Sequence, residues 1–301
     1  MASEVAEKLD AELRAWTSSM VGASDPTVES LREGAEAMGT FGAERSDVVI
    51  DEVDMGGRRA LKHVPQDAGD GVILHLHGGG LTMGSPESHT RLAAHLAARS
   101  KMTVYNLDFR LAPEHPFPAG VEDTAAAFEW LVSQGVAPGR IFLSGDSGGA
   151  ALALSNLIDL TRRGTPPAGG IFMSPWVDFR LVSGSFESNA ESDVMCSRPM
   201  MLPLRQNYCP SGGFEDPRVS PALADLAGLP PLMIQASSTE VLLGDAKLVA
   251  QRASDVGVEI TYEEYDVVPH VFQLFAGNLP EADEALQSVA DWATKALAKD
   301  A

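Results

Sequence analysis

The chain has 301 residues, of which 45% are hydrophobic and 21% charged, a composition typical of a globular protein with a buried core. Its formal net charge of −20 excludes proteins that bind the phosphate backbone of nucleic acid, because those proteins carry a basic patch. No stretch approaches the roughly 18 uncharged apolar residues that span a membrane. The first ten residues lack the basic and apolar regions of a secretory signal. Two cysteines, Cys196 and Cys209, cannot form a disulfide framework. We therefore expect a soluble, cytoplasmic protein.

The N-terminal segment, residues 1–45, has the spacing of two amphipathic helices. Apolar residues recur three or four positions apart at Val5, Leu9, Leu13, Trp16 and Met20, and again at Val28, Leu31, Ala35 and Met38. Asp25 and Pro26 are typical of an N-cap and a first helical turn, and Gly39 and Gly42 end the second helix. Two short helices cannot bury both of their faces alone. We expect them to form a helical cap on a body at residues 46–301.

The body alternates short apolar runs with helical patterns. The expected strands are 48–53, 59–64, 72–76, 103–108, 140–144, 171–174, 232–236 and 260–265. The expected helices are one that opens at Ser85, then 121–131, 150–163, 246–256 and 281–297. Such alternation indicates βαβ crossovers, and hence an α/β fold with a mostly parallel central sheet flanked by helices. Residues 179–214 have no clear period and are interpreted as an insertion that adds to the cap. Its Met195, Met200 and Met201 suit either an acyl pocket or ordinary burial.

A glycine-rich turn, residues 145–149, follows the expected strand 140–144 and precedes a helix. The sequence Gly-Asp-Ser-Gly-Gly has the G-x-S-x-G pattern that holds a nucleophilic serine, here Ser147, exposed on a sharp strand-to-helix turn. The helix N-terminus behind it favours a developing anion. Alternatively, the turn is only a glycine-rich connection. The same string occurs in trypsin-like proteases, but those are all-β proteins whose histidine precedes the serine.

A second glycine run, His77-Gly78-Gly79-Gly80, directly follows the expected strand 72–76. Consecutive glycines leave backbone N–H groups uncovered, which suits an oxyanion hole, and the HGGG motif plays that part beside a nucleophile elbow. Alternatively, the run is only a flexible loop. His75 and His77 form an H-x-H pair, but no ligand cluster with metal-site spacing follows, so we expect no metal.

A base and an acid should follow the serine in the chain. His270 comes just after the expected strand 260–265, at the end of the sheet where α/β proteins build their sites. The acid should follow strand 232–236, where Glu240 and Asp245 are both candidates and Asp266 is a weaker third. The order of serine, acid and histidine is that of the α/β-hydrolases.

These motifs together resemble the hormone-sensitive-lipase family, also called bacterial family IV carboxylesterases, within the α/β-hydrolase superfamily. The match runs over His77 to Gly80, 108–119, 145–149, 216–221, 229–231 and 269–272, and so covers the chain from about residue 45. The family implies hydrolysis of small carboxylic esters with short to medium acyl chains, without a cofactor or metal. It also suggests a homodimer through the edge of the last strand. An amidase, or a non-catalytic small-molecule receptor on the same fold, is the alternative.

By that resemblance Ser147 is the nucleophile, His270 the base and Glu240 the acid, while Gly79, Gly80 and Gly148 supply the N–H groups of the oxyanion hole. Two residues depart from the family pattern. Gly148 stands where alanine is usual, and only its N–H is needed. Glu240 stands where the family most often has aspartate, so the choice between Glu240 and Asp245 stays open at this point. Asp245 would otherwise suit an N-cap of the next helix.

Overall fold

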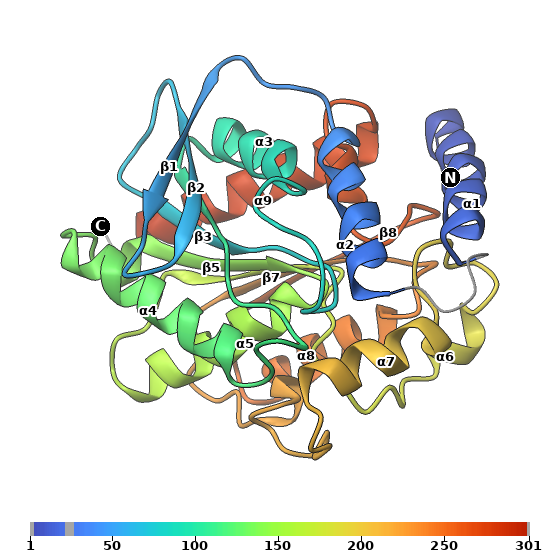
Figure 1. Ribbon diagram of the computed structural model, residues 1–301. Helices are drawn as coiled ribbons and strands as arrows, with labels where there is room; N and C mark the ends of the chain where they lie inside the picture. The colour runs from blue at the N-terminus through green and yellow to red at the C-terminus, as the bar shows by residue number, and fades with distance from the viewer. Residues whose placement is uncertain (1–2, 22–26, 300–301) are drawn as a thin grey trace.

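The computed structural model describes residues 3–21 and 27–299, and these residues build one eight-stranded sheet between two layers of helices (Figure 1). The strand order is β1-β2-β4-β3-β5-β6-β7-β8. The strands are β1 (Val48–Asp54), β2 (Arg59–Pro65), β3 (Val72–Leu76), β4 (Thr103–Leu107), β5 (Ile141–Asp146), β6 (Gly169–Met173), β7 (Leu232–Ser237) and β8 (Ile260–Tyr265). Strand β1 pairs with β2, and β2 with β4, in antiparallel fashion, and all other neighbours are parallel. The mostly parallel sheet expected from the sequence is confirmed.

Helices α3 and α9 cover one face of the sheet, and α4, α5 and α8 cover the other (Figure 1). The helices are α1 (Glu4–Val21), α2 (Val28–Glu36), α3 (Thr90–Ser100), α4 (Ala119–Ser133), α5 (Gly149–Arg162), α6 (Ser185–Ser188), α7 (Arg198–Tyr208), α8 (Leu243–Asp255) and α9 (Pro280–Lys299). Short 3₁₀ turns stand at Ala37–Thr40, Pro138–Arg140, Pro221–Leu223 and Phe272–Phe275. Alternate residues of a strand face opposite layers, so Leu74 packs into one core and Ile73 into the other.

Several elements differ from the expectation, and those nearest the serine turn and the insertion matter most. Helix α3 begins at Thr90 rather than near Ser85, because residues 85–89 first make a turn in which the hydroxyl of Ser88 donates to the carbonyl of Ser85. Strand β5 continues to Asp146, next to the serine. The insertion at 179–214 contains helix α7, which the sequence analysis missed because Pro203 lies inside the helix, where proline is normally excluded. The expected cap at Asp25 and Pro26 falls outside the described residues, and Thr27 is the N-cap of α2.

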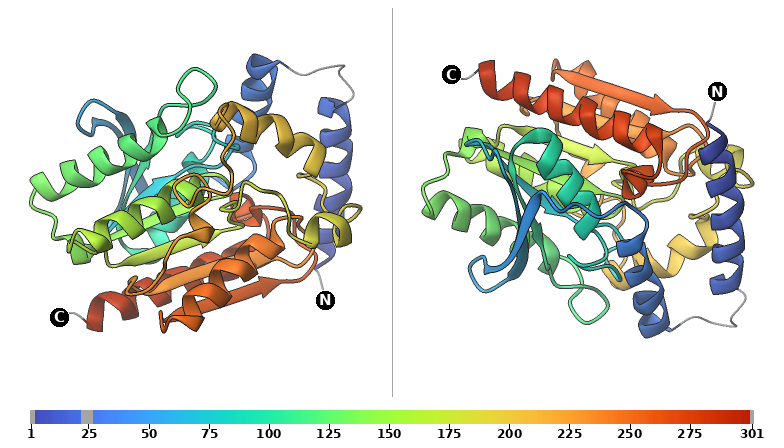
Figure 2. Two further views of the ribbon diagram at one scale, coloured as in Figure 1. Left: turned by 90° about the horizontal axis from the view of Figure 1, so that it is seen from below. Right: turned by 90° about the horizontal axis from the view of Figure 1, so that it is seen from above.

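Helices α1, α2, α6 and α7 lie together at one end of the sheet (Figures 1 and 2). The hydroxyl of Thr17 in α1 donates to the carbonyl of Val194 in the insertion at 2.7 Å. The guanidinium of Arg32 in α2 pairs with Glu114 of the body at 2.8 and 2.7 Å. The N-terminal helices therefore join the insertion to the body. Among the described residues, none of the helices is both long and apolar enough to cross a bilayer.

Candidate active site

Ser147 lies on a sharp turn between β5 and α5. Its φ of +48° is in the left-handed region, which costs a non-glycine residue conformational energy. The turn is held because the N–H of Ser147 donates to the carbonyl of Met173 in the neighbouring strand at 3.0 Å. Gly149 allows the close approach, since a Cβ there would lie 2.0 Å from the carbonyl oxygen of Leu76. The backbone at Ser147 is thus locally strained, and this conformation places the serine hydroxyl beyond the end of the strand.

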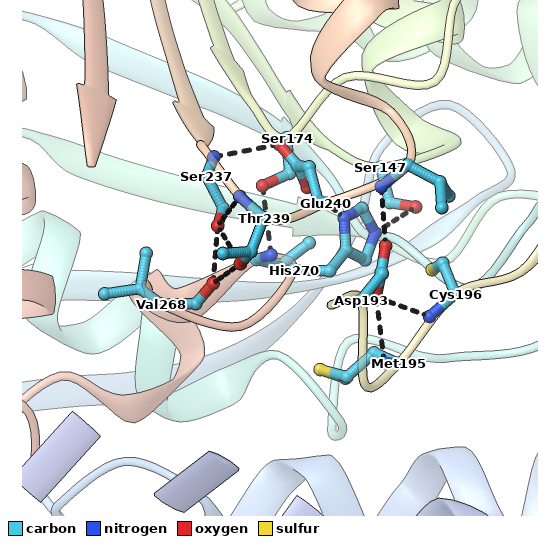
Figure 3. A network of polar contacts seen from close by, with 12 residues as sticks. Ser147, Ser174, Asp193, Met195, Cys196, Ser237, Thr239, Glu240, Val268 and His270 are labelled. Carbon is cyan, nitrogen blue, oxygen red and sulfur yellow. Dashed lines mark hydrogen bonds and ion pairs between the residues drawn. The ribbon is translucent and has the colours of Figure 1, made fainter. Parts of the chain in front are cut away.

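Ser147, His270 and Glu240 form a continuous hydrogen-bonded chain (Figure 3). His270 Nε2 lies 2.9 Å from Ser147 Oγ, and His270 Nδ1 lies 2.6 Å from Glu240 Oε2. The other glutamate oxygen, Oε1, accepts the N–H of Ser237 at 3.0 Å. All three side chains are buried. The structure therefore brings together the serine, the histidine and the first of the acid candidates.

The loop that carries His270 is fixed from two sides (Figure 3). The N–H of Val271 donates to Ser174 Oγ at 3.0 Å, after strand β6. The hydroxyl of Thr239 donates to the carbonyl of Val268 at 3.0 Å. The imidazole is consequently aimed by the loops after β6 and β7, which meet at the carboxyl ends of the parallel strands.

Gly79, Gly80 and Gly148 converge beside the serine. Gly79 and Gly80 have φ values of +109° and +60°, which favour glycine. Gly148 packs against Gly80, because a Cβ on Gly148 would lie 3.2 Å from Gly80 Cα. In the part of the chain that the structure describes, no protein acceptor takes the N–H of any of these three glycines. Their placement is compatible with an anion held next to Ser147.

A cavity of about 530 Å³ opens at the serine and is walled mainly by apolar side chains. Its volume is in the range of small-molecule sites. It is lined by Val28, Leu31, Ala35 and Met38 of the N-terminal helices, by Met195, Cys196, Met200, Met201, Pro203 and Leu204 of the insertion, and by Gly79, Gly80, Met83, Trp176 and Leu274 of the body. Met195, Met200 and Met201 therefore belong to the wall of this cavity.

Comparisons with known proteins bear on the fold, the family and the activity. A family model described as the α/β-hydrolase fold matches residues 73–274. An acetyl-hydrolase of Streptomyces hygroscopicus is 36% identical over 268 residues, which are 88% of each chain, and an esterase of Acinetobacter venetianus is 36% identical over 249 residues, 82% of each. The crystal structure of an esterase from the bacterial hormone-sensitive lipase family has a TM-score of 0.92 at 35% identity, covering 99% of this chain and 100% of that one.

The chain belongs to the bacterial hormone-sensitive lipase family of esterases. As a member of this family it is an enzyme that hydrolyses ester bonds. The resemblance and the fold class expected from the sequence are both confirmed.

The histidine of this esterase has a perturbed acidity. Burial acts to lower the pKa of His270, but Cys196 and Glu240 beside its ring raise that pKa well above its ordinary value. A carboxylate at Nδ1, the ring nitrogen that faces away from Ser147, stabilises the protonated imidazolium. A histidine that acts as a base takes this form when it accepts a proton.

Asp146 holds the glycine run at 77–80 in place. Its Oδ1 accepts the N–H of Gly78 at 3.0 Å, and its two oxygens lie 3.2 Å from Nε2 of His75 and Nε2 of His89. Desolvation by burial would raise the pKa of Asp146, but the two histidines hold it far below its ordinary range. Of the H-x-H pair, His75 thus lies beside the carboxylate that holds the loop, and His77 Nδ1 lies 2.8 Å from the carbonyl oxygen of Gly78. No group of three potential ligands suited to a metal ion occurs among the described residues.

The expectation that Asp245 caps the next helix is wrong. The N-cap position of α8 is taken by Leu242, and Asp245 lies inside the first turn. Its carboxylate instead reaches the loop after β6 and accepts the N–H groups of Val177 and Asp178 at 3.1 and 2.9 Å. Asp266, the third candidate, is exposed. Among the described carboxylates that the sequence offered, only that of Glu240 bonds to His270.

Asparagine at position 245 should leave turnover nearly unchanged and should flatten the pH dependence of stability. Burial raises the pKa of Asp245 to about 8, with the backbone N–H groups opposing this shift. In the unfolded chain an aspartate has a pKa of about 3.9, so the folded protein holds the proton more tightly. The protonated carboxyl therefore contributes stability that is fully present below about pH 4 and is lost as the pH rises through about 8. An amide cannot ionise, and its oxygen can accept both N–H groups.

Urea unfolding at about pH 5 and about pH 8.5 measures this effect. The stability of the wild type minus that of Asp245→Asn should fall between the two pH values. A difference that rises with pH, or a variant without esterase activity, would contradict the assignment. Asp245→Ala should be less stable than Asp245→Asn at both pH values, because it leaves two buried N–H groups unpaired, at about 1–3 kcal/mol each.

Sequence reasoning missed Cys196, Asn189 and Asp193. Cys196 is a free thiol in the cavity wall that influences the titration of His270, and the sequence marked it only as a cysteine without a partner. Asn189 and Asp193 contact the loop that carries Glu240. All three lie in the insertion, where no period pointed to any of them.

Proposed function

We propose that this esterase is a serine hydrolase that works through an acyl-enzyme. Ser147 attacks the ester carbonyl while His270 accepts its proton, and Glu240 holds the imidazole in the required tautomer and stabilises the imidazolium. The protonated His270 then gives its proton to the leaving alcohol, and a water molecule releases the acid by the same steps. The observation that carries the proposal is the pair of contacts at 2.9 and 2.6 Å on the two nitrogens of His270.

The negative oxygen of the tetrahedral intermediate is assigned to the N–H groups of Gly79, Gly80 and Gly148. Support comes from their convergence beside Ser147 and from the position of Gly148 at the start of α5, where the helix end favours an anion. Fixed donors of this kind stabilise charge that develops only in the transition state.

Esters with short to medium acyl chains are the proposed substrates. The cavity beside Ser147 is of limited size and mainly apolar, and its methionines can adapt to acyl groups of differing shape. We assign residues 1–45 and the insertion at 179–214 to a cap over a catalytic body at 46–301, because both segments wall the cavity. The cytoplasmic location and the homodimer stay predictions.

A series of p-nitrophenyl esters with increasing acyl length, beside one p-nitroanilide, tests this function. We expect the highest kcat/KM among the short and medium esters and little or no turnover of the anilide. Greater activity on the anilide would identify an amidase instead. In parallel, a p-nitrophenyl phosphonate should add once to the protein, and peptide mass spectrometry should locate it on Ser147. Label on another residue would refute the serine mechanism proposed here.

Alanine at position 79 should lower kcat by about 10²- to 10³-fold, the loss typical of removing one oxyanion donor. Gly79 has a φ of +109°, and a Cβ there would lie 2.2 Å from the carbonyl oxygen of Met83, so the loop must move. Gly57→Ala is the matched control, because Gly57 has a φ of +92° but open space around it. Equal losses of kcat in the two variants, measured on one ester, would contradict the assignment.

A further inference from the structure

The loop after β7 that carries Glu240, residues 238–241, is held largely by the insertion. We call this segment the acid loop, and residues 185–196 the cap arm. The side-chain amide of Asn189 donates to the carbonyls of Ser238 and Glu240 at 3.0 and 2.8 Å. The hydroxyl of Ser192 donates to the carbonyl of Thr239 at 2.9 Å. Three consecutive carbonyls of the acid loop are therefore bound by side chains of the cap arm.

A single carboxylate in the cap arm links the acid loop to the cavity wall (Figure 3). Asp193 Oδ2 accepts the N–H of Val241, the residue after Glu240, at 2.8 Å. Its Oδ1 accepts the N–H groups of Met195 and Cys196 at 2.9 and 2.8 Å. Met195 and Cys196 line the cavity, so Asp193 fixes both the acid loop and part of the surface that an acyl group would meet.

These contacts matter because most of the acid loop lies beyond the pairing of β7 with β8. The N–H of Ser238 still donates to the carbonyl of Tyr265 at 2.8 Å, but residues 239–241 have left the strand ladder. Strand β7 ends at Ser237, and α8 begins only at Leu243. Buried carbonyls in such a segment need partners from elsewhere in the chain. The contact between Glu240 and His270 is short, at 2.6 Å, so a small shift of the loop would break it. A misplacement of about 1 Å at a reacting group can cost about 10²-fold in rate.

We propose that Asn189 and Asp193 are positioning residues that hold the triad glutamate in place from the cap. The inference rests on the proposed function of Glu240. Among the described residues, the side-chain NH₂ of Asn189 donates only to carbonyls of the acid loop. The carboxylate of Asp193 bonds both to the acid loop and to two residues of the cavity wall. Loss of Asn189 should therefore change kcat alone, and loss of Asp193 should change both kcat and KM.

The first test compares Asn189→Ala with Asn156→Ala on one p-nitrophenyl ester. Asn156 is a matched control, since its buried amide also donates to two carbonyls, those of Val121 and Leu152, within the α4–α5 layer. Asn189→Ala should lower kcat by about 10- to 100-fold with KM unchanged within about twofold. Asn156→Ala should lower the melting temperature and leave kcat of the folded enzyme unchanged. Equal kcat values for the two variants would overturn the proposal.

Two further measurements separate positioning from general destabilisation. The acid limb of the kcat/KM profile should move to lower pH in Asn189→Ala, because a displaced Glu240 no longer supports the imidazolium. In the Glu240→Gln background, the added Asn189→Ala change should cost little more, since the two residues would act through one contact. A full additional loss there, or an unmoved acid limb, would refute the inference. If Asn189→Ala does not fold, Ser192→Ala removes one bond to the acid loop instead of two and should show the same effects at smaller size.

The proposed function and this inference fail in different ways. A fully active Glu240→Gln variant would remove Glu240 from the triad whatever Asn189→Ala does. An inactive Glu240→Gln variant beside an unaffected Asn189→Ala variant would leave the triad intact and refute only the positioning role.

Discussion

Alanine in place of Ser147 should lower kcat by about a millionfold, the loss seen when the nucleophile of a catalytic triad is removed. The hydroxyl that bonds His270 Nε2 is absent in this variant, so no acyl-enzyme can form at position 147. His270→Ala should cost a similar factor, because the serine then has no base. The double variant should be hardly slower than either single one, since the two residues act as a unit. The kcat values of the three variants on one ester measure this.

The control for the nucleophile is another buried serine away from the cavity. Ser100 in α3 donates its hydroxyl to the carbonyl of Leu96 at 2.7 Å, so Ser100→Ala should lower stability slightly and leave kcat near the wild-type value. More than a few per cent of esterase activity in Ser147→Ala, with the melting temperature unchanged, would mean that the mechanism does not use this serine.

Much of the fold could be predicted because buried strands appear in the sequence as short runs of apolar residues. Both faces of the central parallel strands are covered, so β3 appears in the sequence as an apolar run interrupted only by His75. Helix α7 could not be found in the same way. It begins with Arg198-Pro199 and contains Pro203, a residue that helix interiors normally exclude. These prolines conceal the helix even though its buried residues, Met201, Leu204 and Tyr208, stand three and four positions apart.

In the candidate site, too, some residues could be predicted from local sequence motifs and others could not. Ser147 and the glycine run are local motifs, because a tight turn requires particular residues at adjacent positions. The choice between Glu240 and Asp245 depends instead on where two neighbouring carboxylates point. Asp245 is five residues further along, and the first turn of α8 directs it to the loop after β6. The contacts of Asn189 with the acid loop span about 50 positions and leave no local pattern, so only the structure could place them.

Glutamine in place of Glu240 should lower kcat by about ten-thousandfold, the loss measured when a triad carboxylate elsewhere becomes an amide. The amide oxygen can still accept the N–H of Ser237, so the loop should keep its shape. An NH₂ group facing His270 Nδ1, however, favours the tautomer that carries its proton on Nε2, toward Ser147, and such a histidine cannot take the proton of the serine. The kcat of the folded variant, with its melting temperature as a check, measures the loss.

The same variant should also shift the pH dependence of kcat/KM in a defined direction. His270 must be neutral to act as the base, so kcat/KM falls as the pH drops below its pKa. Since Glu240 helps to raise that pKa, its removal should lower the pKa and move the acid limb of the remaining activity to lower pH. Asp245→Asn is the matched control, a buried carboxyl group changed to an amide five residues away, and its acid limb and kcat should stay at wild-type values. The opposite pattern, an inactive Asp245→Asn beside an active Glu240→Gln, would transfer the role of acid to Asp245.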